Sequence, residues 1–208
     1  MNIPIELTIY IENSILPLYD TFDVAHSRSH ADIVIAESLK LSEHYDVNKA
    51  MVYTVAAYHD LGLIHGRENH HIDSGKMVAS DNILRKWFSD EQIQIIKEAV
   101  EDHRASLDNK PRSIYGYIVA EADKDIEPLR ILRRTIQFGL KHYPKIPMEK
   151  HYERLCDHMS EKYAEGGYLK LWLPESSNAK KLTELRAIIA DKEKLYAHFI
   201  EIYKEEMV

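Results

Sequence analysis

The chain has 208 residues, of which 45 % are hydrophobic and 29 % are charged, and its 27 basic and 34 acidic residues give a formal net charge of −7. This composition predicts an ordered globular protein and excludes a disordered or fibrous chain. The acidic balance argues against nucleic acid as the main partner. The single cysteine, Cys156, cannot form an internal disulfide, which favours a cytoplasmic location.

The first twenty residues are apolar in places, but Glu6, Glu12 and Asp20 interrupt them. We therefore expect neither a signal peptide nor a membrane span there, and no membrane partner. Beyond this segment, apolar residues recur three and four positions apart, a pattern that predicts an all-α fold. The expected helices cover residues 5–20, 28–45, 48–60, 72–86, 90–104, 112–125, 128–141, 148–165 and 179–205.

The longest expected connection is the segment 165–178, which opens with two glycines and contains Pro174. We expect a single domain over residues 1–208, with a helical core at 22–140 and a C-terminal helical extension at 141–208. The apolar stripe of the last helix either closes the core or forms the seam of a homodimer, and the sequence leaves both open.

Four of the predicted helices carry a metal-binding side chain in line with their apolar stripe. An inward aspartate costs several kcal/mol unless it is paired, and a shared cation would remove that cost. A lone inward histidine is more often a hydrogen-bonded core residue, and an inward aspartate can cap a helix, but the coincidence on four helices favours a metal site. The four sets are His26, His30, Ile33 and Val34; Val52, Val55, Ala56 and His59; Ile93, Ile96, Val100 and His103; and Gly116, Val119, Ala120 and Asp123.

The order His30, His59-Asp60 and Asp123 resembles the HD-domain superfamily of metal-dependent phosphohydrolases, which is named for the His-Asp pair. "DVAHSRSHADIV" is similar to the opening helix of the family, "VAAYHDLG" to its signature pair, and "YGYIVAEADKDIEP" to the helix that supplies the closing aspartate. The resemblance implies an HD-like helical bundle in which these four residues bind a first metal ion.

Two further positions resemble the dinuclear branch of the superfamily. "NHHIDSGKM" is similar to the family's histidine followed by two small residues; His70 fits best, and His71 is the alternative. "AVEDHRAS" supplies His103. With both histidines present, the resemblance implies a second ion, bridged to the first by Asp60.

Two departures from the family argue against particular activities. Mononuclear HD nucleotidases carry a glutamate three residues after the His-Asp pair, where this chain has Leu63. Guanosine tetraphosphate hydrolases carry a Glu-Asp pair where this chain has Leu63-Ile64. An acidic ligand shortly before an Ile-Glu-Pro turn is, by contrast, similar to HD-type dinucleoside tetraphosphate hydrolases.

Imidazole and carboxylate ligands suit one or two divalent ions of Mn, Fe, Co, Ni or Zn better than Ca. Such ions lower the pKa of bound water, so Asp60 would act in catalysis through the ions it holds. Arg67, Arg104 and Lys124 are predicted to contact a small phosphorylated substrate, the alternative being solvated surface charges. Glu68 is the candidate general acid or base.

Three functions compete on this pattern. The first is a phosphohydrolase acting on a phosphomonoester, a nucleotide or a dinucleoside polyphosphate. The second is a mixed-valent di-iron oxygenase, as in some dinuclear HD proteins. The third is a sensor that binds a nucleotide without catalysis. The remaining histidines are expected to be structural or exposed, and these are His44, His65, His142, His151, His158 and His198.

Overall fold

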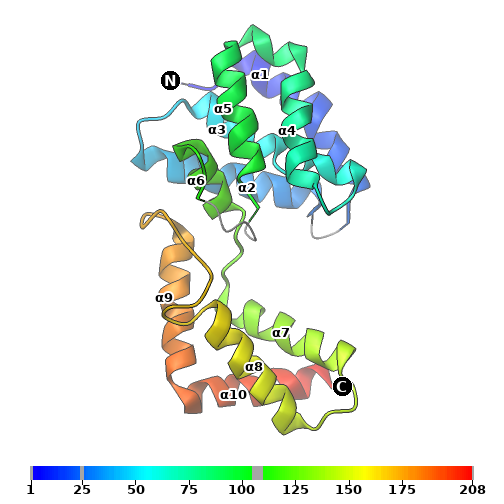
Figure 1. Cartoon of the computed structure of the whole chain (residues 1–208), viewed down its shortest axis with the longest axis vertical. Helices are drawn as coiled ribbons and strands as arrows, with labels where there is room; N and C mark the ends of the chain where they lie inside the picture. Colours follow the sequence, from blue (N-terminus) through cyan, green and yellow to red (C-terminus); the bar gives the residue numbers. More distant parts are fainter. Residues whose placement is uncertain (1, 24–25, 105–109, 208) are drawn as a thin grey trace. The chain divides into compact units, whose positions relative to one another are not determined.

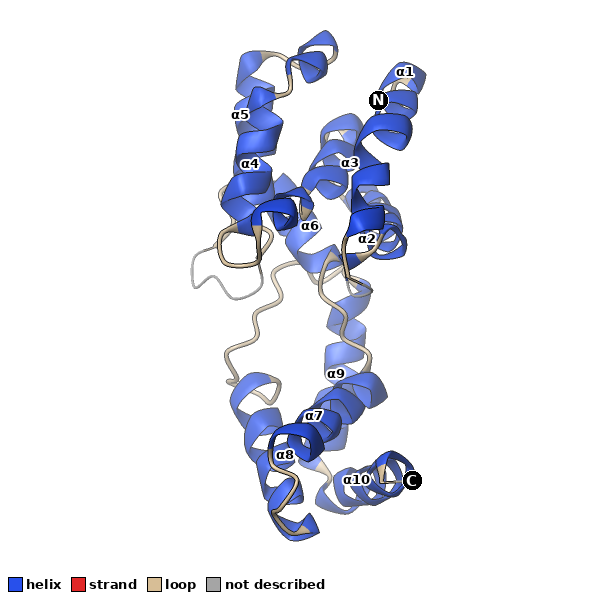
Figure 2. Cartoon of the chain, turned by 90° about the vertical axis from the view of Figure 1, so that its right-hand side faces the viewer, coloured by secondary structure: helices blue, strands red, loops and turns tan. Residues whose placement is uncertain are grey.

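The computed structural model describes residues 2–23, 26–104 and 110–207, and within these ranges the regular structure is helical, with no strand. Figure 2 shows helices joined by turns and loops. The predicted all-α class is confirmed. None of the helices in the described ranges combines the length and the apolar character that a membrane span requires.

The chain forms two compact units, unit 1 over Met1–Lys124 and unit 2 over Asp125–Val208. The expected boundary of the core at residue 140 differs from this division, because it falls inside helix α7 (Pro128–His142), which packs within unit 2. The expectation of a single domain over the whole chain stays a prediction.

Unit 1 is built around a helix that is buried on all sides. In α3, every residue from Ala50 to Tyr58 is buried, as expected of a helix at the centre of a core. Asn48 caps its N-terminus by accepting a hydrogen bond from the Ala50 amide at 3.0 Å. Helices α2, α5 and α6 pack against α3 (Figure 1). The elements of unit 1 are α1 (Ile5–Tyr10), η1 (Ile11–Ile15), η2 (Leu16–Thr21), α2 (Arg28–Leu41), η4 (Ser42–His44), α3 (Lys49–Tyr58), η5 (Leu61–His65), α4 (His70–Ser80), η6 (Asn82–Lys86), α5 (Asp90–Glu101) and α6 (Ile114–Ala122).

One predicted core position in α2 is wrong. Ile33 is 60 % exposed, whereas Ala31, Val34 and Ile35 are buried. The helix begins at Arg28, so His26 precedes it and lies off its regular periodicity. The buried face of α2 therefore runs through Ala31, Val34 and Ile35, and it does not include His26 and Ile33 as the sequence pattern predicted.

Two predicted helices are shorter than expected, because an aspartate interrupts each one. Asp81 has an extended conformation and accepts a hydrogen bond from the Ile83 amide, so it ends α4 and caps η6. Asp191 does the same with the Lys194 amide and separates α9 (Ser177–Ala190) from α10 (Lys192–Glu206). A short acidic side chain that bonds its own backbone favours such a cap over a helix interior.

Unit 2 contains α7, α8 (Met148–Lys162), α9 and α10 around a second apolar core. The predicted packing stripe of α8 contributes Leu155, Met159 and Tyr163 to this core, and Phe199 of α10 is completely buried in it. Helix α7 packs against α8, α9 and α10. The apolar stripe of the last predicted helix thus closes a core within its own unit.

Candidate metal centre

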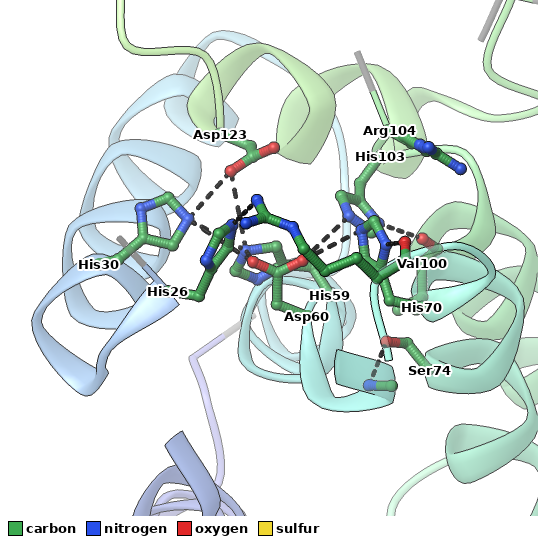
Figure 3. Close-up of polar contacts among 12 residues, drawn as sticks. His26, His30, His59, Asp60, His70, Ser74, Val100, His103, Arg104 and Asp123 are labelled. Atoms are coloured by element: carbon green, nitrogen blue, oxygen red, sulfur yellow. Dashed lines mark hydrogen bonds and ion pairs between the residues drawn. The ribbon is translucent and has the colours of Figure 1, made fainter. Parts of the chain in front are cut away.

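Three of the predicted ligands lie where helices of unit 1 end. His59 follows the last residue of α3, Asp123 follows the last residue of α6, and His103 lies two residues beyond the end of α5. Two others lie where helices begin, His30 in the first turn of α2 and His70 as the first residue of α4. Figure 3 shows these side chains meeting around Asp60.

A first group of side chains surrounds the Oδ2 atom of Asp60. The Nε2 atoms of His59 and His30 lie 3.3 and 3.9 Å from this oxygen and 3.4 Å from each other. The Oδ1 atom of Asp123 lies 3.1 Å from His30 Nε2 and 3.7 Å from His59 Nε2. Two imidazoles and two carboxylates therefore converge on one point.

A second group faces the other oxygen of the same carboxylate. The Nε2 atoms of His103 and His70 lie 3.3 and 3.4 Å from Asp60 Oδ1. The side chain of Asp60 is only 5 % exposed, so these imidazoles and not water surround it. Asp60 thus stands between two ligand groups, with one oxygen turned to each.

Backbone carbonyl groups fix the orientation of three of the imidazoles. The Nδ1 atom of His59 lies 2.7 Å from Ala56 O, that of His103 lies 2.6 Å from Val100 O, and that of His70 lies 2.8 Å from Arg67 O. A carbonyl oxygen can only accept, so each Nδ1 carries a proton and each Nε2 is the nitrogen that faces Asp60. Such partners usually set the orientation of histidine ligands to metals.

Small residues bring the second group close to the first. A Cβ atom on Gly62 would lie 2.0 Å from His70 O and 2.6 Å from Ser74 N, so only glycine allows α4 to begin beside η5. The amide of Gly62 also donates a hydrogen bond to Ser74 Oγ at 2.8 Å. At the residue after Ser74 in α4, a Cβ atom on Gly75 would lie 2.7 Å from the Cγ atom of Glu101 in α5. The His-x₃-Ser-Gly spacing is therefore a packing requirement that positions His70.

The acidic and basic groups of the centre shift each other's pKa values. Burial lowers the pKa of His59, but the carboxylates of Asp60 and Asp123 outweigh this and raise it to about 9. Burial raises the pKa of Asp60, while His59 and His103 outweigh it and hold this pKa far below its ordinary value. Without a metal ion, the centre therefore keeps its charge balance with protons on imidazole.

The predicted substrate contacts lie at the edge of this centre. Arg104 donates from Nη1 to Glu68 O at 2.8 Å, and Arg67 Nη2 lies 3.2 Å from His26 Nε2. Lys124, which follows the end of α6, donates to Ala120 O of that helix at 2.9 Å, and burial lowers its pKa. Their roles in substrate binding, and that of Glu68 as acid or base, stay predictions.

The structure places His70, and not His71, against Asp60. The Nδ1 atom of His71 is buried without a hydrogen-bond partner among the described residues, and burial lowers the pKa of this imidazole. His71 points away from the ligand groups because neighbouring residues of a helix project about 100° apart.

Two neighbours of the centre were not predicted from the sequence. The Tyr19 hydroxyl donates to Ala57 O at 3.1 Å and accepts from the Asp60 amide at 3.3 Å, so it supports the His-Asp turn. Asp23 Oδ1 lies 2.8 Å from His26 Nδ1, and its Oδ2 lies 3.8 Å from Arg67 Nη1. Only the apolar spacing of η2 hinted that Tyr19 faces the core, and Asp23 opens the family-like motif around His26 and His30 without having been given a role there.

Comparison with known proteins gives a family for the region that contains the site. The HD domain family matches residues 24–126. An uncharacterized protein of Clostridium beijerinckii (strain ATCC 51743 / NCIMB 8052) is 33 % identical over 94 residues, which make up 43 % of this chain and 56 % of the relative. The match thus spans little more than half of that relative's length. No solved structure matches the chain.

Residues 24–126, nearly all of them in unit 1, match the HD domain, which confirms the resemblance inferred from the motifs. The family is an all-α superfamily whose members are mostly metal-dependent hydrolases. Two sets of side chains in the described ranges have the spacing needed to hold a metal ion, and they share Asp60. The sets are His30, His59 and Asp60, and Asp60, His70 and His103.

Proposed function

We propose that the protein is a dinuclear metal-dependent phosphohydrolase that acts on a small phosphorylated substrate, either a phosphomonoester, a nucleotide or a dinucleoside polyphosphate. One observation carries this proposal: the two oxygens of the buried Asp60 carboxylate face two separate sets of imidazoles. A bridging carboxylate of this kind is the feature that a pair of metal ions needs and a single structural ion does not.

The donor atoms fit divalent transition metals. Two nitrogens bound at about 2.1 Å in a tetrahedral arrangement lie roughly 3.4 Å apart, and His30 Nε2 and His59 Nε2 are 3.4 Å apart. Mixed imidazole and carboxylate ligands favour Mn, Fe, Co, Ni or Zn. His30, His59, Asp60 and Asp123 would hold the first ion, and Asp60, His70 and His103 the second.

When bound, such ions lower the pKa of a water molecule and offset charge on phosphoryl oxygens. The chain's own residues then position the substrate. Arg104 is anchored through Nη1 to Glu68 O, which leaves the rest of its guanidinium group to donate to a phosphate oxygen. Arg67 is 73 % exposed beside His26 and can reach the same oxyanion. Glu68 follows Arg67 on the loop between η5 and α4, and it is the candidate acid for the leaving group.

Phosphate release from a panel of phosphomonoesters, nucleotides and dinucleoside polyphosphates tests this proposal. The purified chain is treated with a chelator and then reloaded with each metal separately. We expect activity to disappear with the chelator, to return with the metal, and to fall at least about 100-fold in His59→Ala. The matched control is His44→Ala, because His44 is an exposed histidine of the same unit.

Two results would overturn the proposal. One is phosphate release that persists at the same rate in folded His59→Ala protein. The other is oxygen consumption by the iron-loaded protein with no phosphate released from any substrate, which would assign the centre to oxygenase chemistry.

A further inference from the structure

Unit 2 contains a basic stretch that the metal centre does not use. Residues 128–148, which form α7 and the turn that leads into α8, contain five lysines and arginines and no aspartate or glutamate. The chain as a whole is acidic, with a formal net charge of −7. A local excess of positive charge on an acidic protein indicates an anionic ligand.

Carboxylates from outside this stretch neutralise its arginines. Arg130 and Arg134 pair with Asp125 at 2.7 and 3.6 Å. Arg133 pairs with Glu205 and Glu206 of α10 at 2.5 and 2.6 Å.

Arg154 of α8 is the exception among the arginines of unit 2. Arg186 of α9 also has a partner, Glu165 at 3.1 Å. Within the described residues 125–207, Arg154 has no carboxylate within 4.0 Å. Lys141 and Lys145, two residues before and two after Tyr143, are exposed and also lack a carboxylate partner in that range.

Aromatic rings hold the Arg154 guanidinium group in place. Its Cζ atom lies 4.6 Å from the centre of the Tyr143 ring and 5.8 Å from that of Phe138. The two rings are themselves 46 % and 51 % exposed. A guanidinium group stacked on an aromatic face keeps its edge free to donate, and it loses little freedom when an oxyanion binds there.

The side chain of His151 packs beside Arg154. A Cβ atom on Gly139 of α7 would lie 2.6 Å from Arg154 Nη1 and 2.9 Å from His151 Nδ1, so both nitrogens pack against α7 at the same glycine. His151 is 3 % exposed, and its Nδ1 has no hydrogen-bond partner among the described residues. Neither His151 nor Arg154 has a carboxylate partner among the described residues of unit 2, so their own surroundings supply no anion.

We propose that the Arg154 cluster, made of Phe138, Tyr143, His151 and Arg154, is an oxyanion site of unit 2 that takes a phosphate-bearing small molecule. Arg154 donates two parallel hydrogen bonds to the phosphate, and Lys141 and Lys145 add charge at its edge. Phosphate is favoured over carboxylate because a dianion offsets more of the charge of three cations that have no carboxylate partner. The site does not depend on the proposed hydrolase activity.

Titration calorimetry of the chelator-treated full chain tests this site, because chelation removes any phosphate binding through metal ions. Inorganic phosphate and phenyl phosphate are titrated separately at constant ionic strength, so that free phosphate and a phosphate ester are distinguished. We expect binding in the millimolar range or tighter. Arg154→Gln should weaken it at least about tenfold, since hydrogen bonds to charged groups are the strong ones.

Arg130→Gln is the matched control, because it removes an equal charge from α7 at a residue already paired with Asp125. It should change the affinity less than about twofold. Arg154→Lys keeps the charge but not the planar fork and should bind at an intermediate level, and circular dichroism checks that each variant is folded. The proposal is overturned if wild-type protein binds neither ligand, or if Arg154→Gln and Arg130→Gln lose the same amount.

Discussion

His59 in unit 1 and His151 in unit 2 are both almost completely buried, with 0 % and 3 % of their surface exposed. Burial lowers the pKa of each one, yet the net shifts are opposite. Asp60 and Asp123 raise the pKa of His59 to about 9, whereas Arg154 adds to the lowering at His151. The neighbouring charges, and not the depth of burial, decide whether a buried imidazole attracts a cation.

The two histidines also differ in how their ring nitrogens are used. In His59, Nδ1 donates to Ala56 O and Nε2 faces two carboxylates, so both nitrogens have partners. In His151, Nδ1 has no partner among the described residues and lies beside a guanidinium group. The first environment suits a metal ion and the second suits an anion, which is how one chain can present both kinds of site.

Removing the bridging carboxylate should remove the difference between His59 and His151, and this is the largest effect that we expect. In Asp60→Asn, one of the two oxygens becomes an amide nitrogen and the negative charge that both ligand groups share is lost. The metal content should therefore fall below one ion per chain, and phosphate release should fall at least about 100-fold. In the metal-free variant, the pKa of His59 should fall towards that of an ordinary imidazole. Elemental analysis and NMR titration measure the two effects.

Asp46→Asn serves as the control for this variant, because Asp46 is exposed on a loop of the same unit. It should keep the metal content and the activity of the wild type. Two ions retained in Asp60→Asn would contradict the bridging role.

A substitution at Gly62 should separate the two ligand groups from each other. In Gly62→Ala, the new Cβ meets the backbone of His70 and Ser74, so α4 must move away from η5. We expect about 1–3 kcal/mol lower stability in urea unfolding, as in other overpacked sites. The second group should lose its ion, while His30, His59, Asp60 and Asp123 keep theirs.

Ser74→Ala is the matched variant, since it removes the acceptor of the Gly62 amide without adding volume. It should cost about 1 kcal/mol and leave both ions bound. If Gly62→Ala bound two ions as tightly as Ser74→Ala does, the close approach of α4 would not be what positions His70.

Much of the metal centre could be predicted from the sequence because its ligands are tied to helix periodicity and helix ends. Val55, Ala56 and His59 lie on one helix face, and α3 ends at Tyr58, directly before His59. The same logic applied to α5 and α6 identified His103 and Asp123. Spacing along a helix is local, so a single sequence is enough to read it.

Other features depend on contacts that spacing does not encode. Whether Asp81 and Asp191 continue a helix or cap the next one is a competition between side-chain and backbone hydrogen bonds, and tertiary packing decides it. The choice between His70 and His71 depends on how closely α4 approaches Gly62. The assignment of α7 to unit 2 likewise follows from its packing partners and not from its own pattern.

The smallest effect we predict concerns the pH dependence of stability at His151. Its pKa in the folded protein lies below the ordinary value of 6.5, first because of burial and then because of Arg154. Above pH 6.5 the imidazole is neutral in both states and contributes nothing to the pH dependence. As the pH falls below 6.5, the unfolded chain takes up the proton first, so folding stability is lost down to the folded-state pKa.

His151→Gln should therefore show a shallower loss of urea midpoint between pH 7 and about pH 5 than the wild type. The control is His142→Gln, at an exposed position of α7, which should follow the wild-type curve. A steeper loss in His151→Gln would mean that the folded protein stabilises the protonated imidazole, and the contrast with His59 would then disappear.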